Sequence, residues 1–99
     1  MILELATIDI KHGTNADFER NLDAAQHVIN KSKGYISHEF QKCMEVENRY
    51  ILLIKWESLE AHTEGFRKSE LFTQWRGYIG QFFETPPMVQ HYELKFKQG

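Results

Sequence analysis

The sequence predicts an α+β protein of the ferredoxin-like class, with a four-stranded antiparallel sheet and helices on one face of it. Segments of strand and helix character follow one another in the order βαββαβ, which defines the split-βαβ arrangement. The chain has only 99 residues, which is enough for one thin core and too few for a separate cofactor domain. Residues 1–99 are therefore expected to form a single domain.

The first half of the chain supplies two of the strands and one helix. Residues 2–10 are rich in Ile, Leu and Thr and precede a Lys-His-Gly turn signal, which predicts a strand. A helix is predicted after the N-cap candidates at 14–15, because its apolar positions recur at spacings of three and four: Phe18, Leu22, Ala25 and Ile29. Gly34 ends it, and residues 35–43 are predicted as the second strand.

The second half contains the most strand-like segment of the chain, residues 49–56. Two helical stretches are then predicted, the first from Ser58 and the second from Ser69. In the first of these, Leu59, His62 and Phe66 are expected to share one face. Pro86 and Pro87 end the helical region, and residues 89–96 are predicted as the last strand.

The third predicted strand is apolar on both of its faces. One face carries the alternate residues Tyr50, Leu52, Ile54 and Trp56, whereas Ile51 and Leu53 lie on the other. Since the helices cover one face only, the second apolar face would be left in water in a monomer. The sequence therefore predicts a two-fold homodimer whose sheets pack face to face.

Composition excludes several classes of partner. The chain has 12 basic and 14 acidic residues and a net charge of −2, so nucleic acid is not an expected partner. No apolar run is long enough to span a membrane. Cys43 is the one cysteine, which allows no internal disulfide and no thiolate metal site, and which favours a reducing, cytoplasmic setting.

The segment from residue 49 to residue 93 resembles the antibiotic biosynthesis monooxygenase family of dimeric α+β barrels. The matching features are a strand that ends in Trp, an acidic-Ser step, a short helix with His, a Ser-x-x-Phe helix start, a Trp, a Pro-containing loop and a last strand. They are found here as Trp56, Glu57, Ser58, His62, Ser69, Phe72, Trp75, Pro87 and Tyr92. The N-terminal half fits the same order of elements, so the resemblance covers nearly the whole chain.

The resemblance implies a dimeric barrel and leaves several activities open, because the family includes cofactor-free oxygenases, heme-degrading enzymes and other proteins. The heme-degrading branch resembles a site of Asn, Trp and His. In this chain Trp56 matches the Trp, but the Asn position falls at Ala6 and the His position at Arg76. We therefore expect a cofactor-independent oxygenase that acts on a small polyphenolic or quinol-like aromatic. The alternative is a non-catalytic dimer that binds a small ligand, which could be heme.

His62 is the candidate catalytic residue, because its predicted position directs it toward the strand face that bears Trp56. A neutral imidazole could accept a proton from a phenol or hydroquinone. Trp56 could orient the ligand by stacking or through its indole N–H. The structural alternative is a core histidine bonded to a backbone carbonyl and a tryptophan that only packs the core.

Five further residues are candidates for ligand binding. Tyr50 could supply a hydroxyl, Phe66 and Trp75 could form pocket walls, and His38 and His91 could face the cavity or the dimer interface. Ordinary core packing is the alternative for the aromatic residues. The histidines lie on separate elements without ligand spacing, so no metal site is expected. Arg67 and Lys68 could bind an anionic group or form a solvated corner.

Overall fold

The computed structural model describes all 99 residues of the chain. Its elements, in order, are β1 (Ile2–Asp9), α1 (Asn15–Ile29), β2 (Tyr35–Lys42), β3 (Arg49–Trp56), η1 (Ala61–Phe66), α2 (Glu70–Ile79), η2 (Gly80–Phe82) and β4 (Met88–Glu93). Here η1 is a π-helical turn and η2 a 3₁₀ turn. The predicted βαββαβ order and the ferredoxin-like class are thereby confirmed.

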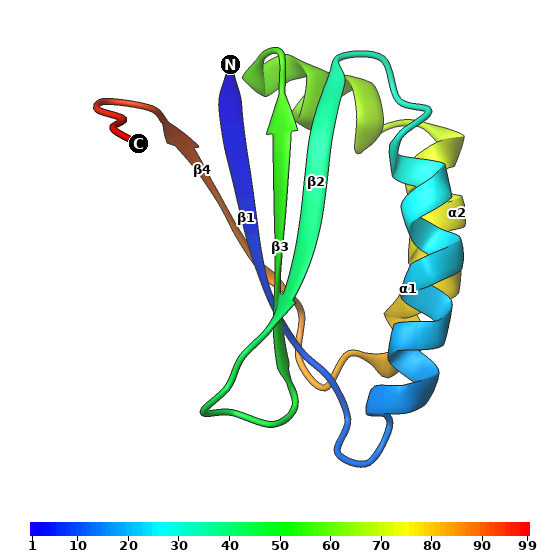
Figure 1. The fold of residues 1–99 in the computed structure, drawn as a ribbon. Coiled ribbons are helices and arrows are strands. Elements are labelled where there is room, and N and C mark those ends of the chain that lie inside the picture. Colours follow the sequence, from blue (N-terminus) through cyan, green and yellow to red (C-terminus); the bar gives the residue numbers. More distant parts are fainter.

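The four strands form one antiparallel sheet in the order β2-β3-β1-β4. Helices α1 and α2 lie side by side against one face of it (Figure 1). The core fills the space between the two layers. Its largest fully buried side chains come from both layers: Trp56, Phe18, Ile8, Ile10, Ile29, Leu52, Ile54 and Ile79. No helix is both long enough and apolar enough to cross a membrane.

The outer face of the sheet carries apolar residues that no helix covers. In β1 and β3 the inward positions alternate with outward ones, and Leu5 pairs with Leu53 across the two strands. Met88 and Tyr92 extend the same face along β4 and remain largely exposed. The structure thus contains the second apolar face that the sequence predicts.

The segment predicted as a helix from Ser58 takes an unexpected form. In η1 the N–H of Arg67 donates to the carbonyl of His62, at 2.9 Å, across five residues. A π-helical turn contains more residues than an α-helical turn. The three-residue step from Leu59 to His62 is therefore too short to bring both side chains to the same face. His62 and Phe66 therefore share the buried face, whereas Leu59 is exposed. The expectation that Leu59 shares this face is wrong for that reason.

The last strand is shorter than predicted. Glu93 at its end pairs with Ile2 at the start of β1. The chain beyond Glu93 has no strand to pair with, so residues 94–96 are not part of the sheet, contrary to the prediction of a strand over 89–96. Leu94 and Phe96 are exposed there.

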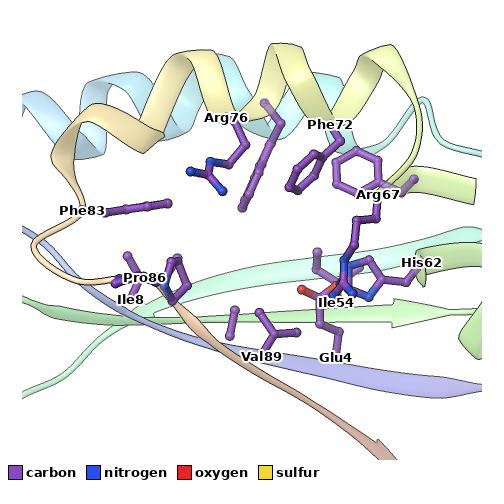
Figure 2. A pocket seen from close by; sticks show the side chains of 14 residues that line it. Glu4, Ile8, Ile54, His62, Arg67, Phe72, Arg76, Phe83, Pro86 and Val89 are labelled. Carbon is purple, nitrogen blue, oxygen red and sulfur yellow. Dashed lines mark ion pairs between the residues drawn. The ribbon is translucent and has the colours of Figure 1, made fainter. Parts of the chain in front are cut away.

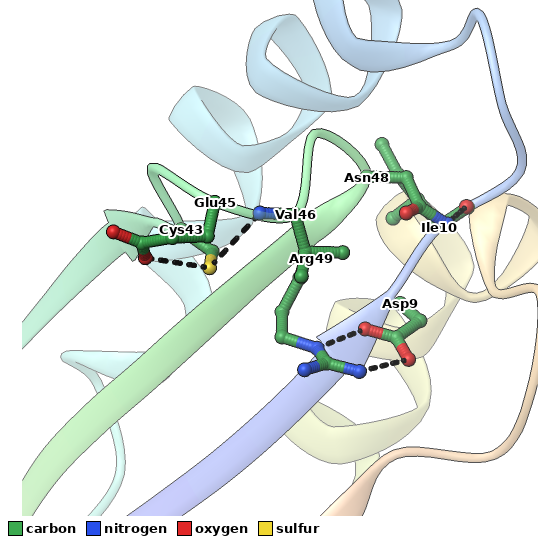
Figure 3. A network of polar contacts seen from close by, with 7 residues as sticks. All are labelled: Asp9, Ile10, Cys43, Glu45, Val46, Asn48 and Arg49. Atoms are coloured by element: carbon green, nitrogen blue, oxygen red, sulfur yellow. Dashed lines mark hydrogen bonds and ion pairs between the residues drawn. The ribbon is translucent and has the colours of Figure 1, made fainter.

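The β2–β3 hairpin is tied to β1 at one end of the sheet (Figure 3). Asn48 donates its side-chain N–H to the carbonyl of Ile10 at 2.8 Å. Arg49 makes two bonds to the carboxylate of Asp9, at 2.8 and 3.2 Å, and they hold the pKa of Asp9 below its usual range. These contacts fix the strand register that also positions the opposite end of the sheet.

Candidate functional site

A cavity of about 230 Å³ lies between the sheet and the η1–α2 segment. Arg76 and Phe72 reach into it from the helix side, whereas Glu4, Ile54 and Val89 border it from the strands (Figure 2). Its lining is mostly apolar: Glu4, Ala6, Ile8, Ile54, His62, Phe66, Arg67, Phe72, Trp75, Arg76, Phe83, Pro86, Pro87 and Val89. A volume of this size suits a ligand of one or two rings, since pockets for drug-sized ligands measure about 300–1,000 Å³.

Glu4 is a carboxylic acid on the inner, otherwise apolar face of β1. It is only 4% exposed, and its Oε1 accepts the indole N–H of Trp56 at 3.0 Å. The same oxygen lies 3.3 Å from Nε2 of His62. Burial raises the pKa of Glu4, while the Trp56 bond and the positive charge of Arg67 oppose that rise.

His62 lies flat on the indole ring of Trp56. The ring centroids are 5.3 Å apart and the planes differ by 15°. The His62 side chain is 4% exposed, and burial, together with the nearby Arg67 and His91, lowers its pKa to about 4. His62 is therefore a neutral imidazole at neutral pH, and it borders the cavity.

His91, from β4, continues this polar chain toward the surface. Its Nε2 lies 2.8 Å from Nδ1 of His62, and burial together with Arg67 also lowers its pKa. The geometry fits one arrangement of protons in which His62 donates from Nε2 to Glu4 and accepts at Nδ1 from His91. Glu4, His62 and His91 thus form a connected path from the buried carboxyl group to a half-buried side chain.

Aromatic side chains form the wall on the helix side. Phe66 packs edge-on against Phe72 and Trp75, and all three border the cavity. The indole Nε1 of Trp75 is buried and has no hydrogen-bond partner. An unsatisfied buried donor is uncommon in a folded protein.

The structure gathers some of the predicted site residues and places others elsewhere. His62, Phe66 and Trp75 line the cavity, and His91 contacts His62. Trp56 is fully buried beneath His62 with its N–H already bonded to Glu4, so it does not offer a free face to a ligand.

Tyr50 and His38 lie outside this cavity. The hydroxyl of Tyr50 donates to Glu19 at 2.5 Å and accepts from Asn15, both on α1, at the opposite end of β3 from Trp56. His38, on β2, bonds Tyr35 and Gln26. Both residues thus stabilise the packing of the helix layer on the sheet.

Sequence reasoning missed Glu4 as a site residue. One signal could have identified it. Alternate residues of the first strand share a face, and Glu4 shares its face with the buried residues Ala6, Ile8 and Ile10. A charged residue at such a position is buried at a cost and therefore calls for a function. Arg76, which stands at the histidine position of the heme-degrading branch, also borders the cavity, and no local pattern in the sequence marks it as a site residue.

No group of three or more His, Cys, Asp or Glu residues could hold a metal ion. The two ring nitrogens of His62 face Glu4 and His91, so neither is free to ligate one. At the positions that the heme-degrading branch uses, Ala6 and Arg76 border the cavity. These residues do not fit a heme site of that type.

The fold is that of a ferredoxin-like α+β protein, and its buried Glu–His–Trp cluster lies beside a mostly apolar cavity. The model of the antibiotic biosynthesis monooxygenase family matches residues 1–78. The chain belongs to this family.

Comparisons with individual proteins agree with this assignment. YczJ, an uncharacterised protein of Bacillus subtilis, is 41% identical over 93 residues, covering 94% of this chain and 98% of YczJ. A crystal structure assigned to the same monooxygenase family, from Bordetella bronchiseptica, matches with a TM-score of 0.92 and 32% identity, over 96% of this chain and 97% of that one.

More distant structures share the fold and differ in chemistry. SnoaB, a cofactor-independent oxygenase from Streptomyces nogalater, is 14% identical, with a TM-score of 0.74 over 99% of this chain and 94% of that one. MhuD, a heme-degrader from Mycobacterium tuberculosis, is 18% identical, with a TM-score of 0.79 over the full length of both chains. At these identities the likeness concerns the fold alone.

Proposed function

We propose that this protein is a cofactor-independent oxygenase that oxidises a small phenolic or quinol-like aromatic with dioxygen. The single observation that carries the proposal is the placement of Glu4 and His62 in the wall of an aromatic cavity. Such a site can bind a planar ring, exclude water and receive a proton.

The proposed reaction begins with transfer of a phenolic proton to the Glu4–His62 pair. Only Oε1 of Glu4 is engaged by Trp56 and His62, so Oε2 is the proposed acceptor. His62 and Trp56 hold the carboxylate in place and stabilise its charge. The electron-rich phenolate that results can pass electrons to dioxygen without a metal or flavin.

The reaction balances for a hydroquinone. Hydroquinone and dioxygen give hydroxyquinone and water: one oxygen atom forms a new C–O bond, and the other leaves as water when the O–O bond breaks. The ring loses four electrons and dioxygen gains four. The new C–O bond replaces a ring C–H bond. The ring gives up that hydrogen and its two phenolic protons: one proton stays on the new hydroxyl group, and two reach the departing oxygen to form water, one of them by way of Glu4. His91 can exchange protons between His62 and solvent.

A second candidate is a non-catalytic module that holds a small ligand in the same cavity. The observation in its favour is the apolar lining, which binds a ring whether or not any chemistry follows. The two proposals differ in a single measurable quantity, the consumption of dioxygen.

We also propose that two copies pair through the outer sheet face, around Leu5, Ile51 and Leu53. The lone thiol of Cys43, which bonds only within its own turn, is compatible with the cytoplasmic location proposed from the sequence.

Oxygen uptake by the metal-stripped protein with a panel of hydroquinones and anthrone-like aromatics tests the proposal. Glu4→Gln keeps the size of the side chain and removes the base, so we expect a fall of about 10²-fold or more in kcat/KM. His62→Gln should also reduce it. Glu64→Gln, at an exposed residue paired with Lys68, is the matched control and should retain the wild-type rate.

Two results would contradict the proposal. One is uptake no faster than the protein-free rate across the panel, which would favour the binding module. The other is uptake that Glu4→Gln and His62→Gln leave unchanged, which would remove these residues from the mechanism.

A further inference from the structure

The cavity wall carries hydrogen-bond donors and positive charge that the protein itself does not satisfy. Arg67 and Arg76 both border the cavity, and neither has an ion-pair partner, whereas Arg20 and Arg49 are paired with aspartates. Both arginines are also exposed to solvent. Since both donate hydrogen bonds and carry a positive charge, a ligand that complements them supplies anionic acceptor oxygens.

The charge of this wall contrasts with that of the whole molecule. The chain has a net charge of −2, yet its cavity is bordered by two guanidinium groups and one carboxyl group. The pKa of that carboxyl group, on Glu4, is raised by burial, and the neighbouring His62 is neutral at pH 7. The local balance is therefore positive even when Glu4 is ionised.

The two guanidinium groups are set apart along the cavity. Arg67 lies beside His62 and Glu4 and influences the pKa values of both. Arg76 extends from α2 toward the other end, where its guanidinium lies 5.9 Å from the ring centre of Phe72 and 5.5 Å from that of Phe83 (Figure 2). These ring contacts hold Arg76 at the cavity without neutralising its charge.

We infer that the ligand of this cavity is an aromatic acid, a ring that carries a carboxylate, and that the positive charges of Arg67 and Arg76 give the cavity its preference for the anionic group. The inference rests on the proposed function for the location of the site and adds the chemical class of its occupant. Arginine suits this task because its planar group donates in pairs to a carboxylate and stays charged at every relevant pH.

Matched aromatic probes test the inference by calorimetry under anaerobic conditions, so that no turnover is required. The probes are 2,5-dihydroxybenzoate, its neutral isostere 2,5-dihydroxybenzamide, and hydroquinone. We expect the acid to bind about tenfold or more tightly than the amide, because a charge-assisted bond contributes about 1.5–3 kcal/mol and about 1.4 kcal/mol corresponds to tenfold.

Variants assign the preference to its residues. Arg67→Gln and Arg76→Gln should each reduce the preference for the acid, and the double variant should abolish it while hydroquinone binding is retained. Arg20→Gln, at an exposed arginine on α1, is the control and should keep the wild-type preference; circular dichroism checks that every variant is folded.

Equal affinity for the acid and the amide would overturn the inference, as would no measurable binding of either at millimolar concentration or a preference that survives in the double variant. This binding test and the oxygen-uptake test of the proposed function can succeed or fail independently. Tight binding of the acid without oxygen uptake would support the inference and refute the oxygenase. Oxygen uptake with no preference for the acid would support the oxygenase and refute the inference.

Discussion

Glu4 is the residue on which the proposed chemistry depends, and its environment predicts how the activity responds to pH. Burial raises its pKa above the ordinary value of 4.5, and only the ionised form can accept a proton. We expect kcat/KM to rise with pH through an apparent pKa above 4.5 and then level off. A pH–rate profile on protein verified as folded tests this, and a flat profile from pH 4.5 to 7 would contradict it.

His62 predicts a pH dependence of stability. Its pKa of about 4 in the folded protein lies below the usual 6.5, so the unfolded chain binds a proton more readily. The stability due to neutral His62 is complete above pH 6.5 and is lost as the pH falls toward 4. The glutamine of His62→Gln cannot be protonated. Between pH 6.5 and pH 4 the free energy of unfolding of this variant should therefore fall by roughly 2–3 kcal/mol less than that of the wild type.

Urea unfolding at pH 6.5, 5 and 4 and at one protein concentration measures this difference. Glu4 acts in the opposite direction, since its raised pKa favours the folded state at low pH, but it is present in both proteins and its direct contribution cancels. His12→Gln, at an exposed turn residue, should follow the wild type. Parallel pH curves for His62→Gln and the wild type would show that His62 is not held neutral.

At the scale of the elements, the position of His62 depends on how closely η1 approaches the start of β2. Gly34 has a φ of +86°, and a Cβ placed there would lie 2.6 Å from the Cβ of Ala61, the first residue of η1. Gly13 has a similar φ of +83° with nothing within 4 Å. The two glycines therefore separate backbone strain from a steric clash.

We expect Gly13→Ala to cost about 1 kcal/mol from backbone strain alone. Gly34→Ala should cost about 1–3 kcal/mol more, because η1 must move away to make room. Chemical denaturation measures both values, and oxygen uptake should fall only in Gly34→Ala. Equal destabilisation by the two changes would mean that the Gly34–Ala61 contact imposes no constraint.

At the scale of the whole molecule, the uncovered apolar face of the sheet predicts association. Leu53 lies at its centre, paired with Leu5 and Glu39 on the neighbouring strands. Leu53→Lys would place a charge in the proposed interface, so we expect the variant to be monomeric at micromolar concentration in light scattering. Leu59→Lys changes an exposed leucine before η1 and should remain dimeric. A wild-type protein that is already monomeric would refute the dimer.

The sequence by itself determined the order and class of the elements. Strand and helix periodicities are local, so residues 49–56 could be identified as a strand, and a helix could be placed after residues 14–15, without knowledge of their neighbours. The end of that helix was predicted at Gly34, whereas α1 ends at Ile29. It also indicated the family, because the spacing of Trp56, His62 and Trp75 is a property of the chain. The π-helical form of η1 was missed, because a single wide turn of this kind leaves no apolar periodicity in the sequence.

Only the tertiary structure decided how the site is assembled. Glu4 bonds Trp56 across 52 positions of the chain and His62 meets His91 across 29, and no local pattern records such distances. The sheet register brings Glu4 opposite His91, and the docking of η1 lays His62 over Trp56. Burial then changes the pKa values of these groups, because desolvation depends on everything packed around them. The chemistry of the cavity therefore follows from packing, although the residues that perform it are already present in the sequence.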